Sequence, residues 1–173
     1  GQYVAYTQNN NLYTVSVADA KVTAITNETT KGILNGYASW VYFEEIFGRP
    51  TKYRAFWWSP DSKYISFMRF DERNVPMFPI YNSEGQHGFV EETRYPKAGD
   101  PNPTVKIGWT SPEGGAITWA DFNEHDDQYF GLPYWKPDSK TLLVQWMNRK
   151  QNQLKIYRLQ WYSCSPQHEV WNC

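Results

Sequence analysis

Apolar and polar residues alternate with a period of two in several short segments, and turn-forming residues bound each segment. This alternation is typical of half-buried β-strands, because successive side chains point to opposite faces of a sheet. Near the start, residues 1–6, 12–17 and 21–26 follow the pattern. The pattern predicts an all-β fold of antiparallel strands. Further strands are expected over residues 64–70, 75–81, 104–109, 116–119, 141–147 and 154–159.

One combination of strand, turn and strand occurs twice in the chain. An aromatic strand end and a Pro-Asp-Ser-Lys turn precede a new strand within residues 57–68, and again 77 residues later within residues 134–146. Proline presets φ at the first turn position, and the aspartate can accept a hydrogen bond from the backbone two residues on. A third copy without the turn opens the chain, where residues 1–6 match residues 62–67 position by position. Such repeats indicate β-propeller blades.

About three blades can be traced in residues 1–173. A closed propeller typically has at least four blades, so we expect a partial β-propeller that is a fragment of a larger ring. On this interpretation, residues 75–81 follow residues 64–70 inside the second blade, and residues 104–109 form the outer strand of that blade. The alternative is a free-standing β-sandwich that shares the same turn motifs.

A segment between the first two blades, residues 35–49, does not alternate like a strand. Ser39 can cap a helix start and Gly48 can end a helix, which predicts a short inserted helix of about two turns. Its apolar face would consist of Trp40, Phe43 and Phe47, at spacings i, i+3 and i+7. The inserted helix would then carry two adjacent acids, Glu44 and Glu45.

The pair Glu44 and Glu45 is the main candidate binding site of the chain. On an α-helix the two side chains lie ~100° apart, so their carboxylates can approach one cation from different sides. A peptide α-amino group, with a reference pKa of about 8, is such a cation and offers three hydrogen-bond donors. The same pair also fits an ordinary solvated helix end.

The composition narrows the possible functions. The net charge of −1 argues against nucleic-acid binding, which needs a basic surplus, and 18% aromatic residues favour β structure. No apolar run approaches the ~20 residues of a membrane helix, and no leader-like segment precedes the first strand. The two cysteines, Cys164 and Cys173, can pair or remain free, but they do not form a disulfide framework or a zinc site.

Three segments resemble one known family. Residues 40–47, with sequence WVYFEEIF, residues 55–61, with sequence AFWWSPD, and residues 95–106, with sequence YPKAGDPNPTVK, occur in the order found in the dipeptidyl peptidase IV family of the prolyl oligopeptidase group. The resemblance extends from residue 1 to about residue 155. It implies the N-terminal β-propeller domain of a serine exopeptidase, whose catalytic α/β-hydrolase domain is absent from these residues.

The resemblance also implies an activity and a role for the glutamates. The family removes dipeptides from peptide amino termini and prefers Pro or Ala at the second position. Its paired glutamates hold the free amino group of the substrate, and this role carries over to Glu44 and Glu45. The family's arginine for the substrate carbonyl lies upstream of the matched region, so this chain lacks it. The stretch from Asn74 to Tyr95 resembles in position a hairpin that serves homodimerisation, and the family implies a periplasmic or cell-surface location.

No catalytic residue is expected in the chain itself. It contains no Gly-x-Ser-x-Gly nucleophile motif, and His87, His125 and His168 stand in polar contexts without a partnered nucleophile. No metal or cofactor is expected either. Two further hypotheses stay open. A non-catalytic propeller module could bind glycans or proteins through exposed aromatic residues, and a glycosidase could use Glu44 and Glu45 as its two carboxylates.

Overall fold

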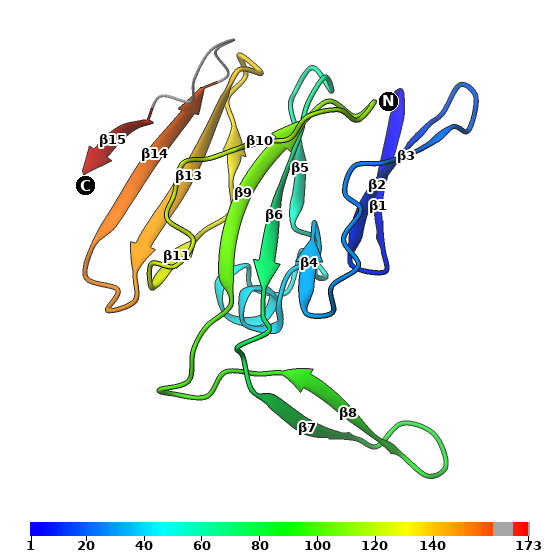
Figure 1. Ribbon diagram of the computed structural model, residues 1–173, viewed down its shortest axis with the longest axis vertical. Coiled ribbons are helices and arrows are strands. Elements are labelled where there is room, and N and C mark those ends of the chain that lie inside the picture. The colour runs from blue at the N-terminus through cyan, green and yellow to red at the C-terminus, as the bar shows by residue number, and fades with distance from the viewer. Residues whose placement is uncertain (161–167, 173) are drawn as a thin grey trace.

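The computed structural model describes residues 1–160 and 168–172, and in these it has three antiparallel sheets of three to five strands that stand side by side, besides a two-stranded hairpin (Figure 1). Cys164 and Cys173 lie outside the described residues, so their pairing remains untested. In the described part, no helix is long and apolar enough to cross a membrane. The all-β prediction and the count of about three blades are confirmed.

The first sheet is a meander of three strands in chain order, β1(Tyr3–Gln8), β2(Asn11–Ser16) and β3(Val22–Ala24). Its first turn places Asn9 and Asn10 at φ of 48° and 62°. Asparagine tolerates this left-handed region better than most residues, which explains the turn between β1 and β2.

The second and third sheets have five strands each. In the second sheet the order is β10-β9-β6-β4, with β5 paired to β6, and in the third it is β11-β13-β14-β15, with β12 paired to β13. The bounds in the second sheet are β4(Ile33–Asn35), β5(Phe56–Trp58), β6(Ile65–Asp71), β9(Thr104–Thr110) and β10(Thr118–Trp119). Those in the third are β11(Gln128–Phe130), β12(Tyr134–Trp135), β13(Thr141–Asn148), β14(Leu154–Gln160) and β15(His168–Asn172).

The two Pro-Asp-Ser-Lys turns adopt the same conformation in both sheets. Ser62 and Ser139 have φ of 60° and 56°, and a carboxylate oxygen of the preceding aspartate accepts a hydrogen bond from the backbone N–H two residues on. Trp58 then pairs with Ile65, as Trp135 pairs with Leu142. The repeat inferred from the sequence is therefore a structural repeat.

The second blade differs from the sequence-based expectation in two ways. Strand β7(Met77–Asn82) does not join the blade, but pairs with β8(Phe89–Arg94) to form a separate two-stranded hairpin, here called the arm, which projects below the sheets (Figure 1). Strand β9 is not the outer strand, because β10 pairs with its free edge. Alternation predicted these strands but not their partners, since register is set by tertiary contacts.

The sheets are joined by two buried clusters. Leu12 of the first blade packs with Ile65 and Phe67 of the second, and a larger cluster joins the second and third blades. A polar contact supports the larger cluster: the indole N–H of Trp135 donates to the Ser66 hydroxyl at 3.0 Å. The large cluster also receives the non-alternating segment that carries Glu44 and Glu45.

Candidate functional site

The segment with the two glutamates forms a π-helix, η1(Tyr42–Ile46), instead of the expected two-turn α-helix. The N–H of Phe47 donates to the carbonyl of Tyr42 at 2.8 Å, an i to i+5 bond that widens the turn. The expected cap at Ser39 does not form: among the described residues its Oγ is buried without a hydrogen-bond partner, and its carbonyl accepts from the N–H of Phe43.

The wider turn also changes which side chains are buried. Tyr42 and Phe47, five residues apart, enter the core with exposed fractions of 0% and 5%, whereas Trp40 and Phe43 are only half-buried. The predicted apolar face is therefore correct for Phe47 and in part for Phe43, which packs against the large cluster, but not for Trp40. It assumed an α-helical period, and i to i+5 bonding places residues five apart on one side.

A hydrogen bond of Tyr42 connects η1 to the third blade. The N–H of Gly131, directly after β11, donates a hydrogen bond to the carbonyl of Gln145 in β13. Because N–H groups alternate in direction along a strand, the N–H of the preceding residue, Phe130, points away from β13. That N–H donates to the hydroxyl of Tyr42 at 3.3 Å. Burial raises the pKa of Tyr42 well above its usual value, so the hydroxyl stays neutral.

Aromatic contacts hold the outer side of η1. Trp40 packs on Tyr95, at the base of the arm, with ring centroids 4.2 Å apart. Phe43 stacks on Tyr53 at 3.8 Å, and Tyr53 stacks on Tyr37 at 4.9 Å. The position of the two glutamates is therefore fixed from the core side by Tyr42 and from the outer side by Trp40 and Phe43.

The two glutamates are adjacent, as predicted, but they differ in environment. The side chain of Glu44 is 15% exposed, and its Oε2 accepts a hydrogen bond from Nε of Arg49 at 2.6 Å. Glu45 is exposed, and within the described residues it has no hydrogen bond or ion pair. One carboxylate is thus already paired with a cation, and the other is open to one.

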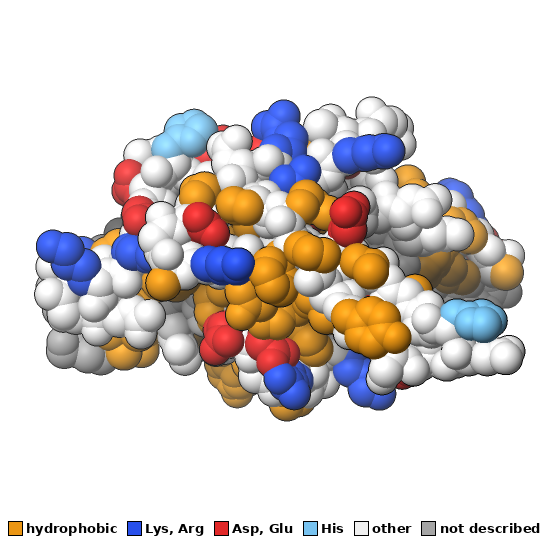
Figure 2. All heavy atoms as spheres, turned by 90° about the horizontal axis from the view of Figure 1, so that it is seen from below, with side chains coloured by type: hydrophobic (Ala, Val, Ile, Leu, Met, Phe, Trp, Pro, Cys, Tyr) orange, Lys and Arg blue, Asp and Glu red, His pale blue; other side chains and the backbone are white. Residues whose placement is uncertain are grey.

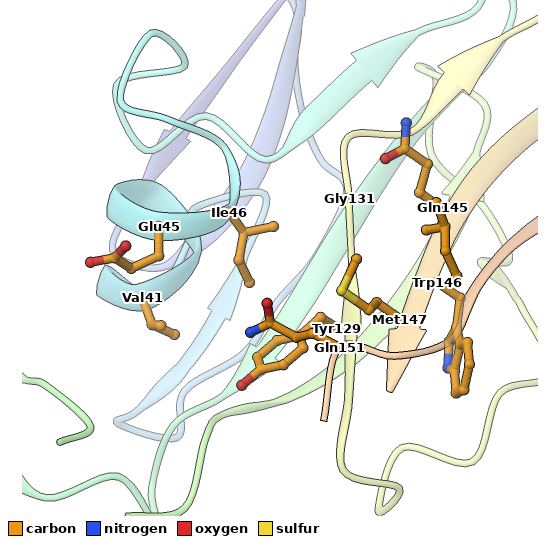
Figure 3. A pocket seen from close by; sticks show the side chains of 10 residues that line it. Val41, Glu45, Ile46, Tyr129, Gly131, Gln145, Trp146, Met147 and Gln151 are labelled. Carbon is orange, nitrogen blue, oxygen red and sulfur yellow. The ribbon is translucent and has the colours of Figure 1, made fainter. Parts of the chain in front are cut away.

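Glu45 lines a cavity of about 490 Å³ between η1 and the third blade. Figure 3 shows Val41, Glu45 and Ile46 on the helix side, with Ile46 facing the opposite wall and the Glu45 carboxylate turned away from that wall. The opposite wall contains Tyr129, Gly131, Gln145, Trp146, Met147, Gln151 and Leu154. Sequence reasoning missed this wall, and no local signal could have found it, because it lies more than 80 residues from Glu45 in the chain.

A second titratable group lies at the base of the arm. Glu72 directly follows β6, and its burial raises the pKa of its carboxyl to about 7, although the charge of Arg94 acts in the opposite direction. Arg94 in turn donates to the carbonyl of Val75 at 2.7 Å, which holds the end of β8 against the start of the arm. His87 and His125 are exposed, and His168 lies in β15, not in a loop.

The described residues contain no group of three His, Cys, Asp or Glu side chains that could hold a metal ion.

Comparison with known sequences assigns the chain to a protein family. The profile described as "Dipeptidyl peptidase IV (DPP IV) N-terminal region" matches residues 1–171. The chain belongs to the dipeptidyl peptidase IV family. Its three blades are therefore part of the N-terminal propeller region of that family.

Fungal proteins are among the curated relatives of the chain. The chain is 35% identical over 157 residues to a probable dipeptidyl-aminopeptidase B of Talaromyces stipitatus, with 82% of the chain and 17% of the relative covered. It is 34% identical over 167 residues to the corresponding protein of Arthroderma gypseum, covering 88% and 18%. The chain thus spans less than a fifth of the length of these relatives.

Two solved structures of the family share the fold. Porphyromonas gingivalis dipeptidyl peptidase 4 superposes with a TM-score of 0.82 and 27% identity, over 97% of this chain and 24% of that protein. A putative dipeptidyl aminopeptidase IV of Bacteroides ovatus gives a TM-score of 0.75 and 32% identity, over 95% and 22%. The fold assignment therefore agrees between sequence and structure.

Proposed function

We propose that this chain is the propeller part of a serine exopeptidase that releases N-terminal dipeptides with Pro or Ala at the second position. In this proposal Glu44 and Glu45 hold the substrate α-amino group. The observation that carries it is the open carboxylate of Glu45 at the edge of a 490 Å³ cavity, beside a second carboxylate on the same helical turn. The dipeptidyl-aminopeptidase relatives support the same class of reaction.

The chemistry of such an anchor is electrostatic. A protonated α-amino group donates charge-assisted hydrogen bonds, which are stronger than neutral ones, and a carboxylate accepts them. Holding the first nitrogen of the peptide fixes which bond reaches a distant serine, so the site selects the bond two residues in. This positioning lowers the barrier because the orientation of the substrate is set on binding. The serine, its histidine and its aspartate would lie outside these residues.

The test uses the full-length parent enzyme and peptides with free or N-acetylated termini. We expect the double variant Glu44→Gln and Glu45→Gln to lower kcat/KM for free-terminus peptides by at least ten-fold, because each lost charge-assisted bond costs about 1.5–3 kcal/mol. The wild-type enzyme should strongly prefer the free terminus. Equal activity on acetylated and free peptides would contradict the proposal.

The alternative is a non-catalytic propeller module that binds glycans or proteins. A fluorogenic Gly-Pro substrate separates the two: the full-length protein should cleave it, and residues 1–173 alone should not. A full-length protein without turnover, together with selective retention on a glycan array, would favour the module. For the exopeptidase we expect a periplasmic or cell-surface location, where peptides with free amino termini are its partners.

A further inference from the structure

Arg49 already binds one of the two carboxylates of the anchor. Its Nε donates to Oε2 of Glu44 at 2.6 Å, and its Nη2 contacts Oε1, so both carboxylate oxygens face the guanidinium. The side chain of Arg49 is 71% exposed, whereas Glu44 is 15% exposed. The pair therefore lies at the surface, with the arginine on the solvent side.

The backbone conformation after η1 brings Arg49 and Glu44 together. Gly48 and Arg49 have φ of 70° and 63°, and two consecutive left-handed residues reverse the chain directly after η1. The N–H of Arg49 donates to the carbonyl of Phe43 at 2.9 Å, which brings Arg49 back beside the residue that follows Phe43, Glu44. Left-handed φ is unfavourable for a residue with a side chain, so this conformation is maintained by its surroundings.

The ion pair of Arg49 and Glu44 reduces the net negative charge at the proposed binding site of the substrate amino group. Glu44, Glu45 and Arg49 together carry one net negative charge, and Glu45 alone remains without a partner in the described part of the chain. One substrate ammonium balances this charge. A second positive charge, from an N-terminal Lys or Arg side chain, would find no free carboxylate here and would lie near the guanidinium of Arg49.

We propose that Arg49 is a specificity-determining residue that disfavours peptides with a basic first residue. The inference rests on the proposed function of Glu44 and Glu45. By neutralising Glu44, Arg49 matches the anchor to a single positive charge, the α-amino group, and selects peptides whose first side chain is uncharged. Removing Arg49 leaves two negative charges at the anchor, which then accommodates a basic side chain as well as the amino group.

The experiment compares kcat/KM for Lys-Pro and Ala-Pro fluorogenic substrates in the full-length enzyme. Arg49→Gln should raise the Lys-Pro to Ala-Pro ratio about five-fold, the effect of one unit charge at about 4 Å in a solvated site. The increase should shrink in 1 M salt, where the Debye length is about 3 Å. Arg49→Lys, which retains the charge, should keep the wild-type ratio.

Lys52→Gln is the matched control, because Lys52 lies exposed in the same loop and makes no ion pair with a described residue. It removes the same charge without touching Glu44 and should leave the ratio unchanged. An equal increase in both variants, or an unchanged ratio in Arg49→Gln, would overturn the role of Arg49. Indifference of the wild-type enzyme to N-acetylation would instead overturn the amino-group anchor, so the two failures are distinguishable.

Discussion

The hydroxyl of Tyr42 accepts a hydrogen bond from the backbone N–H of Phe130 across 3.3 Å, although the two residues are 88 positions apart. This contact joins the helical turn that carries Glu44 and Glu45 to the first strand of the third blade. Tyr42 is fully buried, and among the described residues the hydroxyl and the N–H are hydrogen-bonded to each other alone. The position of the anchor therefore depends on a buried polar contact between two blades.

We expect Tyr42→Phe to reduce the free energy of unfolding by about 1–3 kcal/mol, because it leaves the buried N–H of Phe130 without its acceptor. Urea denaturation followed by tryptophan fluorescence measures the change. Tyr134→Phe is the control, since Tyr134 is 63% exposed, and it should stay within about 0.5 kcal/mol of wild type. Equal stabilities of the two variants would show that the Tyr42 contact contributes nothing.

The sequence predicted the parts of the fold that are encoded locally. The turns at Ser62 and Ser139 follow from Pro, Asp and Ser side chains within four residues, and both turns form as expected. The π-turn at Tyr42 could not be predicted, because it depends on burying Tyr42 and Phe47 against distant strands. The departure of β7 from its blade was hidden from the strand pattern, since a strand in an arm alternates like a strand in a sheet, although the family resemblance did place a hairpin over residues 74–95.

The sequence named the two acids of the candidate site but not the residues around them. Glu44 and Glu45 were identified from their adjacency and from the family resemblance, and they do lie side by side on one turn. The ion pair with Arg49 was missed, because an α-helix that ends at Gly48 gives no reason for the chain to turn back. The cavity wall from the third blade was missed because sequence patterns carry no information on contacts between blades.

Stability should fall as pH rises from about 4.5 to about 7. Burial raises the pKa of Glu72 from its ordinary 4.5 to about 7, so the folded state binds a proton that the unfolded state has lost in this range. The stabilisation is complete below pH ~4.5 and is lost as pH rises through the folded pKa. Allowing for partial solvent access, we expect a loss of about 1–2 kcal/mol.

The variant Glu72→Gln should remove this slope, because glutamine does not titrate. Glu84→Gln, in the exposed loop of the arm, should retain it. The test is the free energy of unfolding of the wild type, Glu72→Gln and Glu84→Gln, measured at pH 5 and at pH 7.5. A slope that is the same in wild type and Glu72→Gln would mean that Glu72 is not the group responsible.

The arm exposes apolar side chains on a two-stranded hairpin. Tyr81 and Val90 are directly opposite in register, with exposed fractions of 68% and 60%. Seen from below, apolar side chains also gather in the middle of the molecule, with acidic and basic side chains around them (Figure 2). Exposed apolar surface of this kind is typical of protein–protein contacts, and we propose that the arm, residues 74–95, mediates a homodimer of the full-length protein.

Val90→Glu should convert this dimer to a monomer in sedimentation velocity, because it places a charge directly opposite Tyr81 in the exposed apolar pair. Gln86→Glu adds the same charge to the exposed tip of the arm, outside the paired strands, and should leave the dimer intact. A wild-type protein that sediments as a monomer at micromolar concentration would exclude a stable dimer through the arm.

The central claim is that Glu44 and Glu45 form the site of the substrate amino group. A crystal structure of the full-length enzyme, with its catalytic serine replaced by alanine and a Pro-containing peptide bound, tests it directly. The account predicts that the α-amino nitrogen lies within about 3.2 Å of a carboxylate oxygen of Glu45, the range of a hydrogen bond. A bound peptide whose amino nitrogen contacts neither glutamate would contradict it.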